Sequence, residues 1–186
     1  ACYKILEAKF RLGLFESRYA SAKDVKNKVF TKEHRQTALD IARRSVVLLK
    51  NDNILPIDTK KYKKILVTGP NADNQSIMGD WVFEQPEKNV STMLQGIKDE
   101  AKGSQVNYVD VGWNLRELDE QKIEVAINSA KSSDLAIVVV GEDSFRQHWK
   151  EKTCGENRDR RDITLWGKQN YLVESIQKTG VPTIVI

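Results

Sequence analysis

Short apolar runs alternate with longer amphipathic runs from residue 63 to residue 186. The apolar runs are typical of buried strands, and they cover residues 64–68, 106–109, 135–140 and 182–186. The amphipathic runs predict helices near residues 91–102, 119–131 and 168–178. Strands that alternate with helices usually form parallel βαβ units with right-handed crossovers. The pattern therefore predicts an α/β fold, in which a mostly parallel sheet is sandwiched by helices.

Residues 1–62 carry a helical pattern without strand signals. Residues 3–15 space their apolar side chains as an amphipathic helix does, whereas residues 17–30 have poor periodicity and predict a connection. Thr31 is a candidate N-cap for a second helix. The expected buried stripe of that helix consists of Ala38, Ile41, Ala42, Ser45, Val46 and Leu49. We therefore expect helices and an interdomain linker over residues 1–62, and the α/β domain over residues 63–186.

The two ends of the chain suggest that it is a piece of a larger protein. It begins without an initiator methionine, directly in a helical pattern, and it ends in the apolar run 181–186. No stretch approaches the roughly 20 apolar residues of a membrane-spanning helix. No signal peptide is visible. The sequence leaves the cellular compartment open, with a periplasmic or secreted location favoured over the cytoplasm.

Charge and cysteine content argue against several classes of partner. The net charge is +4 and the pI about 9.0, yet dense basic runs occur only at residues 60–64 and 158–161. Neither run offers the coherent basic face with stacking aromatics that nucleic-acid binding requires. Cys2 and Cys154 lie far apart and have no partner at CxxC spacing. We therefore expect no nucleic-acid partner, no structural zinc and no cofactor.

The polar stretch after the third predicted strand is the best candidate for a functional site. A continuous apolar run at 135–140 indicates a strand buried on both faces, and residues 141–167 then form a long charged loop. Long loops in compact domains are often functional, and open α/β sheets bind ligands at the carboxyl ends of their strands. The loop contains Glu142, Asp143, Glu151, Glu156 and Asp159, together with His148, Trp149, Arg158 and Arg160.

Other candidate sites are weaker when the residues are considered alone. Residues 69–74 (GPNADN) lack the spacing of a phosphate-binding loop, so a sharp turn is the better interpretation. Trp81 could equally be a platform for a sugar ring or a plug at the edge of the core. Cys154 would need a base to become a nucleophile, and nothing in the sequence orients the nearby His148. Glu156 is a single loop carboxylate, whereas glycoside hydrolysis requires a pair.

Several segments carry a combination of motifs. They are residues 42–51 (ARRSVVLLKN), 54–57 (ILPI), 65–73 (ILVTGPNAD), 79–81 (GDW), 138–142 (VVVGE), 154–160 (CGENRDR) and 162–165 (DITL), together with Gln169. Taken together, these segments resemble glycoside hydrolase family 3. Residues 3–15 are similar to the helical segment that leaves the first domain of this family, a TIM-like barrel. The resemblance covers nearly the whole chain, and the order of the motifs makes it specific.

The resemblance implies part of a retaining, exo-acting β-glycosidase of the β-glucosidase type. In such enzymes a barrel aspartate is the nucleophile and a glutamate on a loop of the α/β sandwich is the general acid/base, which maps onto Glu156. Trp81 matches an aromatic residue that some relatives place against the sugar. We further expect an ion pair between Asp159 and Arg160 that braces the loop. Glu142, at the end of the strand, is the second candidate for the acid/base and a further anchor of the loop.

Two departures from the family pattern and two rival functions remain. The acid/base motif reads CGEN where many relatives have SGEG, and Trp166 stands where proline is frequent. Because the barrel partner and its nucleophile are missing, we expect this chain alone to be inactive. The same fold could instead serve as a non-catalytic carbohydrate-binding or scaffolding module, or as a flavodoxin-like nucleotide-binding domain.

Overall fold

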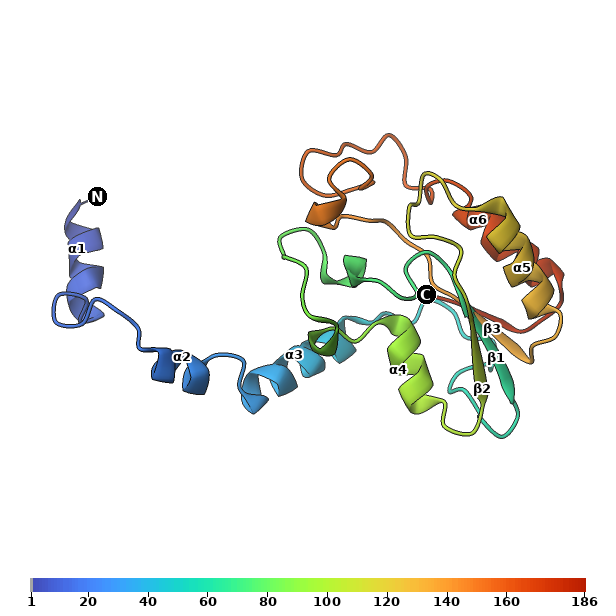
Figure 1. Cartoon of the computed structure of the whole chain (residues 1–186), viewed down its shortest axis with the longest axis horizontal. Coiled ribbons are helices and arrows are strands. Elements are labelled where there is room, and N and C mark those ends of the chain that lie inside the picture. The colour runs from blue at the N-terminus through green and yellow to red at the C-terminus, as the bar shows by residue number, and fades with distance from the viewer. Residues whose placement is uncertain (1) are drawn as a thin grey trace. The chain divides into compact units, whose positions relative to one another are not determined.

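The computed structural model describes residues 2–186, which divide into two compact units, Ala1–Asn51 and Asp52–Ile186 (Figure 1). The first unit contains helices α1 (Cys2–Arg11), α2 (Ala22–Lys28) and α3 (Lys32–Ser45). Thr31 caps α3 as predicted, because its hydroxyl accepts a hydrogen bond of 3.3 Å from the backbone N–H of His34. Helix α2 was not predicted. The hydroxyl of Ser21 caps it, and capping together with favourable end charges defines so short a helix better than apolar periodicity does.

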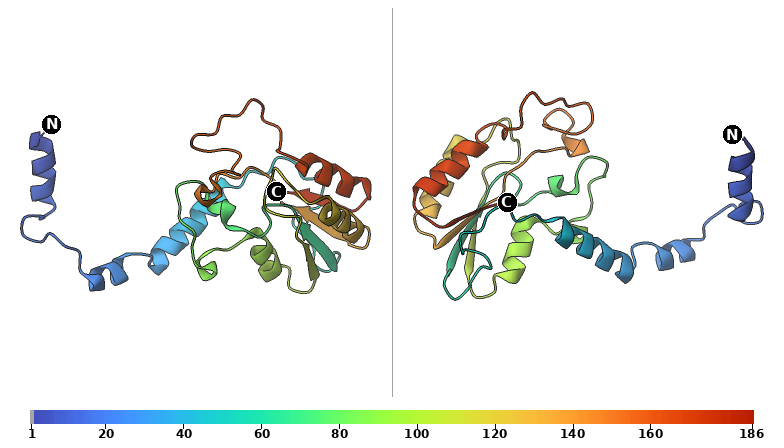
Figure 2. Two further views of the ribbon diagram at one scale, coloured as in Figure 1. Left: turned by 45° about the horizontal axis from the view of Figure 1, so that its top comes forward. Right: turned by 180° about the vertical axis from the view of Figure 1, so that it is seen from behind.

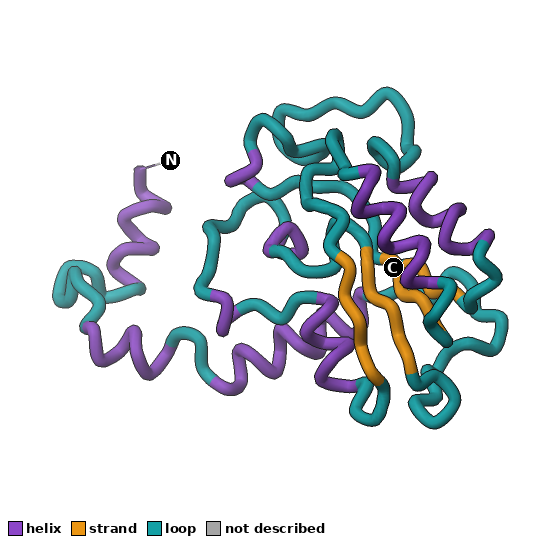
Figure 3. Tube along the Cα trace, turned by 45° about the vertical axis from the view of Figure 1, so that its right-hand side comes forward, coloured by secondary structure: helices purple, strands orange, loops and turns teal. Residues whose placement is uncertain are grey.

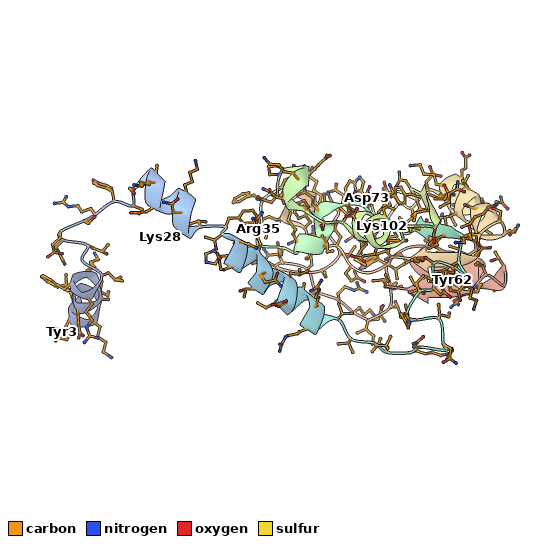
Figure 4. All side chains as sticks on the ribbon, turned by 90° about the horizontal axis from the view of Figure 1, so that it is seen from below. Tyr3, Lys28, Arg35, Tyr62, Asp73 and Lys102 are labelled. Carbon is orange, nitrogen blue, oxygen red and sulfur yellow. The ribbon has the colours of Figure 1, made fainter. Side chains whose placement is uncertain are left out.

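The apolar side chains of the first unit are exposed, which corrects the prediction of a buried stripe on the second helix. No described residue of α1, α2 or α3 is buried, and the exposed fraction reaches 63% for Ile41 and 92% for Leu49. Helix α3 ends at Ser45, so Val46 and Leu49 lie beyond it. Figure 4 shows the side chains of this unit, such as the labelled Tyr3, extending from single helices. An apolar helix face is buried only where another surface packs on it, and this unit supplies none.

The second unit is built on a four-stranded parallel sheet, as predicted. Its strands are β1 (Lys64–Thr68), β2 (Gln105–Val109), β3 (Leu135–Val138) and β4 (Thr183–Val185), and their order in the sheet is β2-β1-β3-β4. Figure 3 draws the strands in orange. Strand β1 pairs with β2 on one side and with β3 on the other. The chain thus changes direction across the sheet between β1 and β3, and open sheets bind ligands at such switch points.

Helices cover both faces of this sheet. Helices α5 (Glu120–Ala130) and α6 (Gln169–Lys178) lie on one side, and α4 (Met93–Glu100) lies on the other (Figure 2). Side chains of β1 alternate between the two layers, because Leu66 joins the core beneath α5 and α6 whereas Ile65 and Val67 join the core beneath α4. Tyr62, labelled in Figure 4, is buried in the α4 layer just before β1. The predicted α/β sandwich is therefore confirmed.

The carboxyl ends of β1 and β3 meet at a close backbone contact. Gly69 follows β1 with a φ of +110°, and a Cβ atom there would lie 2.1 Å from the carbonyl oxygen of Val139. Only glycine permits this approach. From this point one loop runs over residues 69–92 and includes the short 3-10 helices Gln75–Met78 and Glu87–Asn89. A second loop runs over residues 139–168 and includes the short 3-10 helix Arg146–His148.

Candidate functional site

The second loop begins with a clamp between the sheet and α6. Gln169, the first residue of α6, is fully buried. Its side-chain oxygen accepts a hydrogen bond from the N–H of Gly141, and its amide nitrogen donates to the carbonyl of Gly141, both at 2.9 Å. The clamp therefore gives hydrogen-bond partners to the N–H and the carbonyl of Gly141, where the chain leaves the core, as buried polar groups require.

Two segments of this loop are held side by side by Asp143 and Thr153. The N–H of Asp143 donates to the Thr153 hydroxyl at 3.0 Å, and the N–H of Thr153 donates to the Asp143 carbonyl at 2.7 Å. The buried Asp143 carboxylate also lies 2.5 Å from Nδ1 of His148, whose ring stacks on Trp113. Asp143 thus orients the imidazole ring of His148.

Cys154 has no features of an activated nucleophile. Partial burial raises the pKa of its thiol, and the neighbouring carboxylates of Glu142 and Asp143 raise it further. The reactive form of cysteine is the thiolate, so this environment favours the unreactive thiol. The structure therefore agrees with the weak standing of Cys154 among the candidates.

Glu156 and Trp81 come together through Arg146. The guanidinium of Arg146 donates a hydrogen bond of 2.6 Å to the Glu156 carboxylate, and its central carbon lies 3.8 Å from the ring centroid of Trp81. The Glu156 side chain is 43% exposed, and Trp81 is 75% exposed. Two residues that are far apart in the sequence thus stand at one exposed place beyond the ends of β1 and β3.

Asp80 connects the loop of residues 69–92 to the loop of residues 139–168, next to Glu156 and Trp81. One oxygen of its carboxylate accepts hydrogen bonds from the backbone N–H of Glu156 at 2.9 Å and from Nζ of Lys152 at 3.3 Å, and the other lies 3.4 Å from Arg146. The Asp80 side chain is only 12% exposed. The bond from the Glu156 N–H, followed by Lys152 and Arg146, holds the pKa of Asp80 below its usual value.

Lys152 is the least expected member of this group because it is fully buried. Its ammonium lies against Asp80 and 4.3 Å from the ring centroid of Trp149. Lysines are rarely buried unless they are paired, so the pair with Asp80 explains its position. Sequence reasoning missed Asp80, Lys152 and Arg146 as site residues. The one available signal was that Asp80 directly precedes Trp81.

Arg160 braces the loop through Glu142 and not through Asp159, which corrects the predicted pair. Its guanidinium lies 2.5 Å from Glu142 and 3.9 Å from Asp162, and none of the ion pairs found in the described chain includes Asp159. Trp166 is partly buried, with the Arg160 guanidinium 5.3 Å from its ring centroid.

The segment GPNADN forms a closed turn. The N–H of Ala72 donates to the carbonyl of Gly69 at 3.1 Å, and that of Asn71 to the carbonyl of Val139 at 3.4 Å. The Asn74 side chain caps the following 3-10 helix. The N–H groups of Asn71 and Ala72 are thus used within the fold, which supports the interpretation of this segment as a turn.

A cavity of about 710 Å³ lies beside this turn, at the ends of β1 and β2. Its wall includes Asp73, Tyr108, Asp110, Trp113 and His148, whereas Glu156 is not part of it. Burial, Asp110 and Asp73 together raise the pKa of Tyr108 to about 12. The cavity is therefore acidic and aromatic, and it is separate from the exposed Glu156 carboxylate.

The described residues show neither a metal-binding group nor a membrane-crossing helix. Within residues 2–186, no cluster of three or more His, Cys, Asp or Glu side chains could hold a metal ion. In the same range, no helix combines the length and apolar character that crossing a membrane demands.

Comparisons with known proteins identify relatives over nearly the whole chain. It is 36% identical to a β-xylosidase of Formosa agariphila, over 100% of this chain and 26% of the relative. It is 28% identical to a periplasmic β-glucosidase of Salmonella typhimurium, over 98% of this chain and 26% of that protein. The chain therefore spans about a quarter of the length of these relatives.

Solved structures agree with these sequence relatives. A β-glucosidase involved in saponin metabolism from intestinal bacteria superposes with a TM-score of 0.83 at 31% identity, over 97% of this chain and 28% of that one. The β-glucosidase of Listeria innocua in complex with glucose gives 0.79 at 27% identity, over 97% and 23%. The family described as glycosyl hydrolase family 3 C-terminal domain matches residues 46–186. The chain thus belongs to glycosyl hydrolase family 3, and most of it is the C-terminal domain of that family.

Proposed function

We propose that this domain supplies the general acid/base of a retaining, exo-acting β-glycosidase, and that Glu156 is that residue. The substrate is a terminal β-linked sugar of the glucose or xylose type, because relatives carry the names of both β-glucosidases and β-xylosidases. The observation that carries the proposal is the exposed Glu156 carboxylate, which shares Arg146 with Trp81. The backbone N–H of Glu156 is held by the Asp80 carboxylate.

The chemistry requires one carboxyl group that gives up and later takes back a proton. In a retaining enzyme it protonates the leaving oxygen while a second carboxylate attacks the sugar, and it then deprotonates the water that releases the sugar. Arg146 bonds one carboxylate oxygen of Glu156, Oε2. Within the described chain Oε1 forms no hydrogen bond, so it is available to the glycosidic oxygen.

The partner carboxylate comes from outside this chain, on a barrel domain of the same parent protein. The two carboxyl groups of a retaining site stand about 5–5.5 Å apart. Within this chain, the Asp80 carboxylate contacts Lys152, Arg146 and the Glu156 N–H, and we assign it to holding the loop. Because the proposed nucleophile lies on the barrel, we expect the isolated chain to be inactive.

Trp81 is proposed to hold the sugar. Arg146 covers one face of its indole, and the high exposure of the residue leaves other surface open. A flat apolar face suits the C–H face of a pyranose, because aromatic rings bury large apolar areas without losing a hydrogen bond. The acid/base and the sugar platform would then contact the same arginine.

The first test is the substitution Glu156→Gln in the barrel-containing parent. Loss of general acid/base catalysis should lower kcat/KM on a natural β-linked disaccharide by about 10²- to 10⁴-fold. The loss should be much smaller in the glycosylation step of an aryl β-glycoside with an activated leaving group, because that group needs little protonation.

Glu151→Gln is the matched control, since Glu151 lies on the same loop and uses its backbone carbonyl, not its side chain, to bond Arg116. If Glu156→Gln hydrolyses the disaccharide as the native parent does, with an unchanged pH profile, the acid/base assignment is wrong. That result would favour the rival view of a non-catalytic carbohydrate-binding or scaffolding module.

A further inference from the structure

The turn that presents Glu156 is built around the carboxylate of Asp80. Glu156 donates its backbone N–H to Oδ2 of Asp80 at 2.9 Å, across a sequence separation of 76 residues. The same oxygen accepts a bond from the fully buried Lys152 of the Glu156 loop. One carboxylate from the first loop thus holds two points of the second loop.

Packing at Gly155 shows how closely the two loops fit. A Cβ atom at position 155 would lie 2.7 Å from Oδ2 of Asp80, closer than a Cβ atom comes to its non-bonded neighbours. Gly155 also has a φ of +87°, which favours glycine. The backbone just before Glu156 therefore passes directly over the Asp80 carboxylate, in a conformation that a larger residue would disturb.

Arg146 extends this contact from the backbone of Glu156 to its side chain. Its guanidinium lies 3.4 Å from Asp80 and 2.6 Å from the Glu156 carboxylate, so it links the two acids. Lys152 and Arg146 together place two positive charges against Asp80 and Glu156. Removing the charge of Asp80 would leave the buried Lys152 without the partner that compensates its burial.

We propose that Asp80 is a positioning residue for Glu156, and that it sets the place of this carboxyl group relative to the glycosidic bond. This inference rests on the proposed role of Glu156 as acid/base. Asp80 fixes the peptide between Gly155 and Glu156 directly and orients the Glu156 carboxylate through Arg146. Because Trp81 is the next residue, the same loop fixes the proton donor and the sugar platform together.

A positioning role makes a prediction that a general loss of stability does not make. Proton donation over a changed distance slows substrates with poor leaving groups, whereas substrates with good leaving groups need little donation. A merely structural residue would lower the amount of folded enzyme and slow all substrates equally. The dependence of the rate on the leaving group therefore separates the two roles.

The experiment measures kcat/KM of the full-length parent on a natural disaccharide and on a series of aryl β-glycosides of increasing leaving-group pKa. Asp80→Asn should lower the rate on the disaccharide by about 10- to 100-fold, the value of a hydrogen bond to a charged group. The rate on the best leaving group should fall by less than about 3-fold. Asp99→Asn on the exposed face of α4 is the control and should leave all rates unchanged.

Two further variants test the inference even if the Asp80→Asn enzyme folds poorly. Gly155→Ala changes the same contact from the Glu156 loop, because its methyl group would displace the Asp80 carboxylate. This variant should also slow substrates with poor leaving groups more than substrates with good leaving groups. In the Glu156→Gln background, Asp80→Asn should add less than about 3-fold to the loss. Residues that act as a unit show such non-additivity.

The outcomes distinguish this inference from the proposed function. Suppose that Glu156→Gln strongly lowers kcat/KM for the disaccharide, but Asp80→Asn lowers kcat/KM for all substrates equally. Asp80 then has no positioning role, although Glu156 remains the acid/base. The same conclusion follows if the fold-losses of Asp80→Asn and Glu156→Gln multiply in the double variant. If Glu156→Gln has no effect on the disaccharide, the proposed function itself fails.

Discussion

At the scale of single residues, the site depends on contacts that join distant parts of the sequence. Glu156 and Trp81 were expected from a resemblance of motifs, and the structure brings them to one arginine. Asp80 and Lys152 could not be expected, because their meeting spans 72 residues and no local pattern encodes it. The predicted pair of Asp159 with Arg160 was wrong for the same reason, since Arg160 reaches Glu142 across the loop.

The role of Trp81 is a prediction at this scale. Trp81→Ala in the parent should raise KM for the natural disaccharide by about 3- to 10-fold, because it removes an aromatic contact surface for the sugar. Trp81→Phe should restore much of the affinity, since a flat ring remains. Phe83→Ala is the control, because Phe83 is another exposed aromatic residue of the same loop. Equal KM values for Trp81→Ala and Phe83→Ala would contradict the sugar-binding role.

At the scale of elements, periodicity predicted the four strands and the three helices of the second unit. It succeeded because β1 and β3 are buried on both faces and the helices carry one apolar face each. It failed for α2, which is too short to show a period, and it could not reveal that the stripe on α3 is exposed. Burial depends on a second surface, which a local pattern does not contain.

The clamp between Gln169 and Gly141 gives a prediction about these elements. Gln169→Leu would leave the N–H and the carbonyl of Gly141 without partners, at a cost of about 1–3 kcal/mol for the buried groups. We expect the amide of Gly141 to lose protection from hydrogen exchange. The control variant Asn170→Leu, at the exposed residue next to Gln169, should leave that protection unchanged. Unchanged exchange at Gly141 in Gln169→Leu would show that the clamp does not hold the loop.

At the scale of the whole molecule, the chain is about a quarter of the length of its relatives. The family match begins at residue 46, and the compact units divide after Asn51. The expected boundary after residue 62, the barrel partner and the nucleophile stay predictions. The helices of the first unit expose apolar side chains, and exposed apolar patches are typical of surfaces that another domain or protein covers.

The central claim is that Glu156 is the acid/base of a retaining enzyme, and one measurement tests it most directly. The parent carrying Glu156→Ala is incubated with an activated aryl β-glycoside and sodium azide. Azide attacks a covalent glycosyl-enzyme without needing a base, whereas water needs one. We predict that azide accelerates turnover and that the product is the β-glycosyl azide. Turnover that azide does not change, with free sugar as the only product, would contradict the claim.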